Sequence, residues 1–217
     1  NNSESNKSKE EKRRQMMTQE LMILEDEYVA LKPMQSSHIK DLYRAGKDLA
    51  IWQWTTANYC QTLDITKQWV ESCIEKARLN LQQPFVIVDK TQNEIVGSTS
   101  YLNISVEHES IEIGFTFLNP NAQRSFVNRR CKLLLLTHAF ETLKLNRVAF
   151  QTHQKNQRSR TAISAIGATF EGIHRDCRIQ QDGSIRSSAI YSIIKPEWPQ
   201  VKCKLLAKLT QPTIEKI

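Results

Sequence analysis

Residues 109–141 read ESIEIGFTFLNPNAQRSFVNRRCKLLLLTHAFE. In the first part of this stretch, Ile111, Ile113, Phe115 and Phe117 alternate with polar or small residues. A two-residue period is typical of a β-strand with one apolar face. We therefore expect a strand over 109–118 that turns these four side chains to the same side.

The second part of the same stretch predicts a buried helix. From Asn128 the chain places apolar residues over four turns, namely Leu133, Leu134, Leu135, Leu136, Ala139, Phe140 and Leu143. This run is too long for a strand. Asn119-Pro120-Asn121 is a turn signal between the strand and the helix. A tight strand-to-helix loop directs free N–H groups and the positive end of the helix dipole to one point, where phosphate commonly binds.

The charge distribution also favours an anionic ligand. Between Arg124 and Arg160 nine basic residues stand against Glu141 alone, so this window carries +8 while the whole chain carries +7. A positive field around one loop-to-helix junction suggests a polyanion. The alternatives are a solvated basic helix face and nucleic-acid binding. The sequence has no recognisable nucleic-acid-binding module, which argues against nucleic-acid binding.

Length and composition fit a cytoplasmic globular protein. The chain has 217 residues, of which 40% are hydrophobic, and no apolar run approaches the length of a membrane span. Five scattered cysteines without a C-x-x-C spacing argue against a disulfide framework or a metal site. Residues 1–20 are predicted to be a disordered or tag-like leader, and residues 21–217 a single domain with a C-terminal helical tail.

The remaining elements mix strands and helices. Strands are expected over 28–32, 85–88, 95–104, 147–152, 168–180 and 185–194. Helices are expected over 36–50, 65–82 (capped by Asp64), 157–166 (capped by Asn156) and the tail to Leu209. Asp182-Gly183 is a hairpin signal between the last two strands. This order predicts an α/β fold with a mostly antiparallel sheet.

An irregular stretch over 51–63 carries three aromatic residues, Trp52, Trp54 and Tyr59. These rings could line a substrate groove. They could equally anchor the loop on the core, because aromatic side chains bury large areas.

The order of elements, together with several short motifs, resembles the GNAT acetyltransferases, and within them the RimJ/RimL-type branch. The matching segments are Ile95-Val96-Gly97-Ser98-Thr99, Glu112-Ile113-Gly114-Phe115-Thr116, Gln123-Arg124, the KLLLLTHAF run over 132–140, Asn156-Gln157-Arg158-Ser159, Gly167-Ala168, Glu171-Gly172 and Glu197-Trp198-Pro199. The resemblance extends from about Tyr28 to the C-terminal tail. It implies a GNAT-like mixed, mostly antiparallel central sheet flanked by helices.

The resemblance implies acetyl-CoA as the donor and an amine as the acceptor, either a small molecule or a protein N-terminus. It implies that the protein uses no metal and binds no membrane. It also implies a monomer or a homodimer. Pantetheine would follow the strand at Phe117 and Leu118 and bond to Asn156. The diphosphate and its surroundings would involve Gln123, Arg124, Ser125, Phe126, Val127, Asn128 and Arg129.

Phe126 departs from the family pattern, which has a glycine at this position of the loop. Its ring could obstruct the phosphate site, and a positive φ would be strained there. Arg124, Arg129 and Arg130 could offset the obstruction by charge. The alternative is a protein of the same fold that binds CoA or another nucleotide with weakened catalysis.

Glu112 is the first candidate for the general base. It lies on the polar face of the 109–118 strand, and burial would move a carboxyl pKa toward the useful range. Glu112 could also be an ordinary cross-strand polar partner. His108 and Asp176 are weaker candidates for the base. By the resemblance, Ser159 would protonate the departing thiolate, or else be a plain first-turn helix residue.

Overall fold

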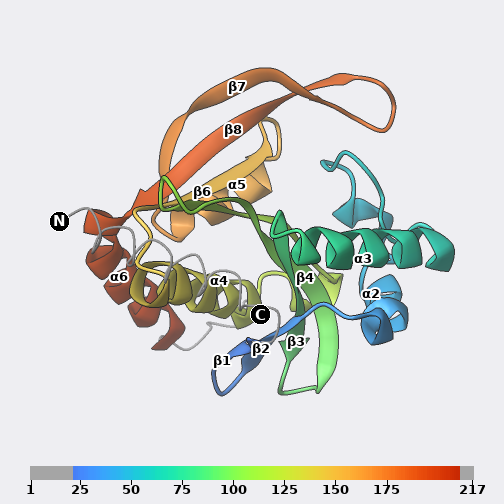
Figure 1. Cartoon of the computed structure of the whole chain (residues 1–217), viewed down its shortest axis with the longest axis horizontal. Coiled ribbons are helices and arrows are strands. Elements are labelled where there is room, and N and C mark those ends of the chain that lie inside the picture. Colours follow the sequence, from blue (N-terminus) through green and yellow to red (C-terminus); the bar gives the residue numbers. More distant parts are fainter. Residues whose placement is uncertain (1–21, 211–217) are drawn as a thin grey trace, which may run out of the picture.

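A computed structural model describes residues 22–210, so the leader predicted over 1–20 lies outside the described residues. Within this range eight strands form one sheet in the order β1-β2-β3-β4-β5-β6-β8-β7 (Figure 1). The strands are β1 (Leu24–Glu25), β2 (Val29–Pro33), β3 (Gln82–Asp89), β4 (Glu94–Ser105), β5 (Ser110–Leu118), β6 (Arg147–His153), β7 (Thr169–Ile179) and β8 (Ile185–Ile194). All neighbouring pairs are antiparallel except β5 and β6. The predicted fold class is confirmed.

Helices cover both faces of this sheet. They are α2 (Ile39–Ala45), α3 (Leu63–Arg78), α4 (Phe126–Thr137), α5 (Gln157–Ala165) and α6 (Trp198–Thr210), and a π-helical turn over His138–Thr142 continues α4. Figure 1 shows α4 and α6 on one side and α2 and α3 on the other. The core is accordingly split into two clusters of buried residues, with Leu135 in the first and Val70 in the second.

A β-bulge in β5 changes the face that its side chains occupy. Ser98 pairs with Phe117 but Ser100 pairs with Gly114, so a single β4 residue opposes two on β5. Phe115 takes a positive φ of 46° there and is 42% exposed, while Phe117 packs in the cluster under α2 and α3. The prediction that Phe115 and Phe117 share one face with Ile111 is therefore wrong, because the extra residue reverses the alternation.

The parallel pairing of β5 and β6 is short. It joins Ser110, Ile111 and Glu112 to Arg147, Val148 and Ala149, and the two strands separate beyond that point. Since β5 continues to Leu118 and β6 to His153, the second half of each strand borders an opening in the sheet. This separation is the feature of the fold that positions the site.

Two predicted helix boundaries differ from the structure. The helix expected over 36–50 ends at Ala45, and Leu49, within the expected range, is 73% exposed. Gly46 ends this helix where no larger residue fits, since a Cβ there would lie 2.3 Å from the Cys60 Sγ. α3 is capped by Thr62, whose side chain accepts a hydrogen bond from the Ile65 N–H, rather than by Asp64.

Candidate functional site

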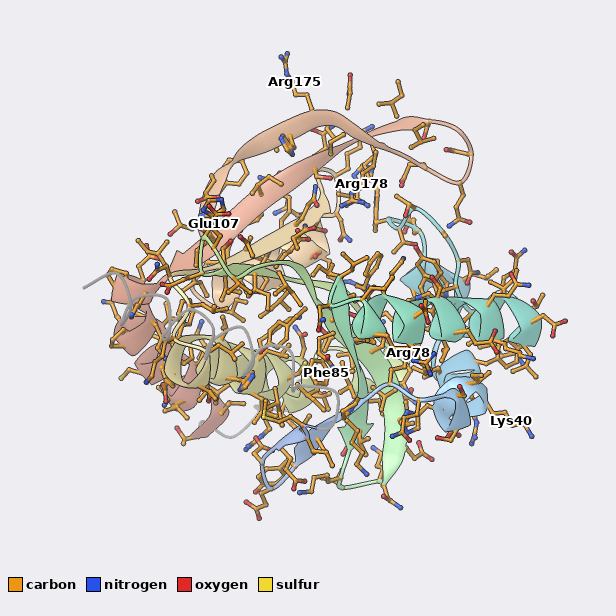
Figure 2. The ribbon with its side chains drawn as sticks, in the orientation of Figure 1. Lys40, Arg78, Phe85, Glu107, Arg175 and Arg178 are labelled. Atoms are coloured by element: carbon orange, nitrogen blue, oxygen red, sulfur yellow. The ribbon has the colours of Figure 1, made fainter. Side chains whose placement is uncertain are left out.

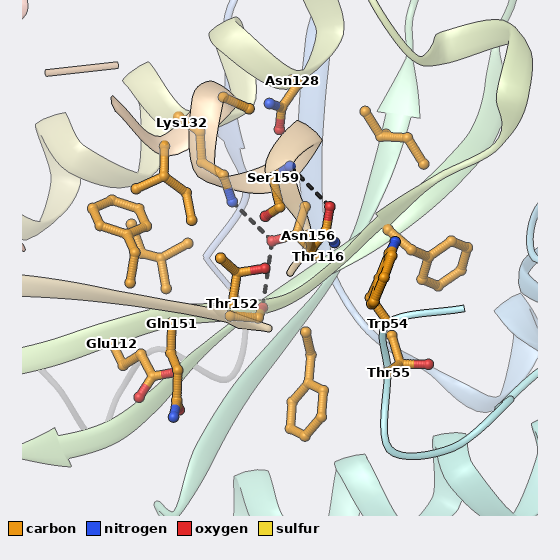
Figure 3. A pocket seen from close by; sticks show the side chains of 18 of the residues that line it. Trp54, Thr55, Glu112, Thr116, Asn128, Lys132, Gln151, Thr152, Asn156 and Ser159 are labelled. Carbon is orange, nitrogen blue, oxygen red and sulfur yellow. Dashed lines mark hydrogen bonds between the residues drawn. The ribbon is translucent and has the colours of Figure 1, made fainter. Parts of the chain in front are cut away.

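A cavity of about 660 Å³ lies where β5 and β6 separate. Residues 112–118 of β5 and 150–152 of β6 line it (Figure 3). The first turns of α4 and α5 border it where β5 ends, and residues from the 51–59 loop and from the β7–β8 hairpin also line it. At about 3.3 Å per residue, the six steps from Glu112 to Leu118 span about 20 Å, so the site is elongated along β5.

The N-terminus of α4 lies directly after β5. Ser125 caps the helix, and its Oγ accepts a hydrogen bond from the Val127 N–H at 3.2 Å. Gln123 links the loop to its surroundings, since its amide donates to the Leu118 carbonyl at 2.8 Å and accepts from Arg158 at 2.9 Å. The first turn of a helix leaves further N–H groups without intrahelical acceptors. A helix N-terminus of this kind is able to bind an anion, which is what the sequence led us to expect here.

Phe126 does not face this cavity. Its ring packs edge-on against Tyr28 with the ring centroids 5.8 Å apart, against the core cluster under α4. The positive φ in the loop, 62°, falls on Arg124 instead. The expected obstruction by Phe126 is therefore absent from this structure. Val127, also expected at the cofactor site, is fully buried in the core and does not line the cavity.

The basic residues of the 124–160 window separate into two groups. Those that line the cavity are Arg124, Arg129, Lys132 and Arg158. Others are engaged elsewhere: Arg130 pairs with Asp26 at 2.8 Å, and Arg147 bonds to Glu171. The expectation that Arg130 supports the anion site is wrong, because this side chain is turned toward Tyr28, 4.0 Å from the ring centroid.

Lys132 is a cavity residue that the sequence analysis missed. It is only 7% exposed, and its Nζ donates to the Thr116 Oγ1 at 2.8 Å across the opening between α4 and β5 (Figure 3). Thr116 also bonds to Thr99 at 2.8 Å. Burial lowers the pKa of the Lys132 amine. The available signal was a single lysine in an apolar helix, one turn after Asn128 and thus on the same face.

Asn156 and Ser159 lie together at the start of α5. The Asn156 Oδ1 accepts a hydrogen bond from the Ser159 N–H at 3.0 Å, and both residues line the cavity (Figure 3). Asn156 is thus the helix cap that the sequence predicted. Because capping uses only the Oδ1 atom, its amide N–H₂ group still has donors to offer a ligand.

Glu112 lies at the last residue pair of the β5–β6 ladder and lines the cavity. Its Oε2 accepts a hydrogen bond from the Asn103 amide at 2.7 Å. Gly114 leaves room for the carboxylate, since a Cβ there would lie 3.3 Å from Oε1 and 2.7 Å from the Leu102 Cδ1. This geometry holds the carboxylate in one place and leaves Oε1 as an acceptor.

The other candidate groups are less well placed. His108 lies in the exposed turn before β5, and Asp176 bonds to Ser187; neither lines the cavity. Cys131 is buried in the core, and burial raises the pKa of its thiol to about 11, so the thiolate is scarce at neutral pH.

The three aromatic residues of the 51–63 stretch lie in two different environments. Trp54 and Tyr59 line the cavity. Trp52 is buried instead, with its indole N–H donating to the Gly46 carbonyl at 2.7 Å and its ring tilted against Phe117. It anchors the loop on the core, which was one of the two roles left open by the sequence.

Two further classes of site are not found among the described residues. No helix between residues 22 and 210 combines the length and apolar character needed to cross a bilayer. Over that range, no three His, Cys, Asp or Glu side chains are grouped so that they could hold a metal ion.

Residues 29–169 match the acetyltransferase (GNAT) domain family, and the chain belongs to this family. The resemblance drawn from the sequence motifs is thereby confirmed, as is the assignment to an acyltransferase family.

Similar proteins point to the same branch. The chain is 32% identical over 104 residues to "Putative ribosomal N-acetyltransferase YdaF" of Bacillus subtilis (strain 168), which covers 48% of this chain and 56% of that protein. It thus spans little more than half the length of this curated relative. A putative acetyltransferase from T. thermophilus is 31% identical with a TM-score of 0.77, covering 86% of this chain and 96% of the other. Mycobacterium smegmatis RimJ in complex with CoA-disulfide shares the fold, with 22% identity, a TM-score of 0.70, and 83% and 88% coverage.

Proposed function

We propose that the chain transfers the acetyl group of acetyl-CoA to a primary amine, with the α-amine of a protein N-terminus as the acceptor. The observation that carries this proposal is the separation of β5 from β6 in line with the α4 N-terminus. The name of the relative YdaF, a putative ribosomal N-acetyltransferase, supports a protein substrate.

The opening between the strands suits a pantetheine arm. Because β6 pairs with β5 only as far as Glu112, the following β5 residues present backbone groups to the opening on that side. Acetyl-CoA would lie along them with its diphosphate at the first turn of α4, near Arg124 and Arg129. Lys132 and Asn156 would offer side-chain donors to the arm between these ends.

The chemistry needs two proton transfers. As the amine nitrogen bonds to the thioester carbonyl carbon, the Glu112 carboxylate accepts a proton from the amine, directly or through a water molecule. When the carbon–sulfur bond breaks, the Ser159 hydroxyl donates a proton to the thiolate and regains one from solvent. The products are an N-acetyl amine and free CoA. Both residues line the same cavity, which this mechanism requires.

Release of free thiol from acetyl-CoA in the presence of an amine panel, with mass spectrometry of the products, tests the proposal. The panel contains N-terminal peptides, polyamines and amino sugars. Thiol release coupled to a mass increase of one acetyl group on the peptides is expected. Calorimetric CoA binding without thiol release for any amine would instead support the weakened-catalysis alternative, which the orientation of Phe126 no longer favours.

A further inference from the structure

Two arginines from the β7–β8 hairpin reach the cavity. Arg178 and Arg186 are direct cross-strand partners, so their side chains share a face, and both line the cavity. Arg178 donates to the Gln151 Oε1 at 3.1 Å, and Arg186 donates to the Trp54 carbonyl at 3.2 Å. Figure 2 shows Arg178 beneath the hairpin and Arg175 pointing away from the molecule.

Within the part of the chain that the structure describes, neither of these guanidinium groups has an acidic partner. None of the salt bridges found within residues 22–210 includes either of them. Arg186 is only 8% exposed, and its Nε has no hydrogen-bond partner in that range. Like charges that face each other across two strands destabilise a sheet, and a buried, incompletely bonded guanidinium adds to that cost. A bound anion would relieve both.

Glu112 lines the same cavity as the two arginines. Burial lowers the pKa of the Arg186 guanidinium, the charge of Arg178 lowers it further, and the charges of Cys177 and Glu112 raise it. Among residues 22–210, Glu112 forms no salt bridge with either arginine. Because Glu112 and both arginines line one cavity, an acceptor whose amine binds at Glu112 shares this cavity with the two guanidinium groups.

We propose that Arg178 and Arg186 bind a carboxylate of the acceptor, so that the preferred substrate is a peptide N-terminus with Asp or Glu among its first two residues. This inference rests on the proposed acetyl transfer. Planar guanidinium groups match carboxylates in geometry and charge, which makes Arg pairs suited to such recognition. Recognition at the hairpin would leave the diphosphate site at α4 unchanged.

Matched peptides test this specificity. Ser-Glu-Ala-Ala-Tyr-amide and Ser-Gln-Ala-Ala-Tyr-amide differ only in one side-chain charge, as do Asp-Ala-Ala-Ala-Tyr-amide and Asn-Ala-Ala-Ala-Tyr-amide. We expect the acidic member of at least one pair to have a kcat/KM about tenfold or more higher, mainly through KM. Calorimetric titration of the same peptides into the CoA complex should give the same order of Kd.

Variants of the hairpin connect the preference to the arginines. Arg178→Gln should reduce the acidic-to-neutral ratio to nearly 1, and Arg178→Lys should retain part of it. Arg175→Gln, on the same strand but outside the cavity, is the control and should keep the full ratio. A ratio that Arg178→Gln does not change would overturn the assignment.

The outcomes separate this inference from the proposed function. Equal acetylation of both members of each pair overturns the inference and leaves acetyl transfer standing. If no peptide is acetylated but the acidic peptides bind more tightly to the CoA complex, acetyl transfer fails while carboxylate recognition stands. Equal binding without turnover removes both.

Discussion

The two ends of the cavity are built from different kinds of sequence. The end that we propose binds acetyl-CoA, called the cofactor end, consists of residues close together along the chain, in the segments 118–129 and 156–159. The acceptor end joins the 51–59 loop, Glu112, Gln151 and the two hairpin arginines, which come from four distant parts of the chain. At the first end, local turn and capping rules fix the geometry, whereas at the second, long-range contacts fix it.

We expect the cofactor end to serve a function common to the family and the acceptor end to determine which substrate is bound. A helix N-terminus that follows a strand binds phosphate through its backbone N–H groups, so this binding is compatible with many different side chains. An acceptor site depends on individual side chains, so Arg178 and Arg186 determine specificity only if this particular hairpin curves over the cavity. We therefore expect substitutions at the acceptor end to change catalysis and specificity, and substitutions at the cofactor end to change CoA affinity.

Glu112→Gln should have the largest effect. Removing a general base typically lowers kcat by about 10²- to 10⁴-fold, and the isosteric amide keeps the size of the side chain. The Kd for CoA should stay unchanged, because this residue belongs to the acceptor end. Steady-state kinetics and calorimetry check both values.

Glu107→Gln is the control for that substitution, since Glu107 lies in the exposed turn before β5 and points to solvent (Figure 2). It should retain the activity of the original chain. If Glu112→Gln keeps more than about a tenth of kcat, Glu112 is not the general base. The expected difference between the two ends in their effect on catalysis would then be lost.

Arg124→Gln should weaken CoA binding by about tenfold, since a charge-assisted hydrogen bond to phosphate contributes about 1.5–3 kcal/mol and Arg124 is exposed to screening solvent. The effect should shrink as salt is added. Lys40→Gln, an exposed residue on α2, is the matched control for the loss of one positive charge. An unchanged Kd would place the diphosphate elsewhere.

The cofactor end could be predicted from the sequence because its signals are local. The turn at Asn119-Pro120, the basic segment and the Asn156 cap all follow from residue type and spacing, and residues of the basic segment and Asn156 line one cavity. The fold class followed from the period-two and helical patterns for the same reason. Phe126 was the exception, because sequence spacing does not reveal which way a ring turns.

Glu112, Trp54 and Tyr59 at the acceptor end were expected from the sequence, but Arg178 and Arg186 were not, because irregular strand pairing determines which hairpin residues line the cavity. The extra residue in β5 exposes Phe115, and the shift in β7 between His174 and Arg178, with a positive φ of 49° at Asp176, sets which hairpin side chains face inward. The single extra residue in β5 moves every following side chain to the other face, whereas two extra residues in β7 bring Arg178 opposite Arg186. No local sequence pattern signals either irregularity. Lys132 was missed for a different reason, since a lysine in an apolar helix is usually solvent-facing.

Phe126→Gly tests whether the glycine that the family has at this position would increase the affinity for CoA. We expect CoA affinity to stay within about threefold, because the ring already lies against Tyr28 and outside the cavity. The free energy of unfolding should fall by about 1–3 kcal/mol through lost burial of the ring. Calorimetry with CoA and urea denaturation measure the two quantities, and a marked gain in affinity would show that Phe126 does obstruct the site.

Asp26→Asn should have the smallest effect, about 1 kcal/mol of stability at neutral pH, by removing the charge that pairs with Arg130 of α4. Burial raises the pKa of Asp26, but hydrogen bonds from Arg130, Val29 and Tyr28 outweigh this and lower it below the ordinary 3.8. A lowered carboxyl pKa stabilises the folded state above the unfolded pKa, and that stabilisation is lost as the pH falls through the folded value.

The difference in unfolding free energy between the original chain and Asp26→Asn should therefore be constant from about pH 5 to 7 and shrink below about pH 4. The asparagine retains an Oδ1 acceptor for the Tyr28 and Val29 N–H groups, so the comparison isolates the charge. Because this ion pair fastens α4 to the segment before β2, far from the hairpin, the preference for acidic peptides should not change. If that preference fell together with stability, the two ends of the cavity would be coupled through α4 rather than independent.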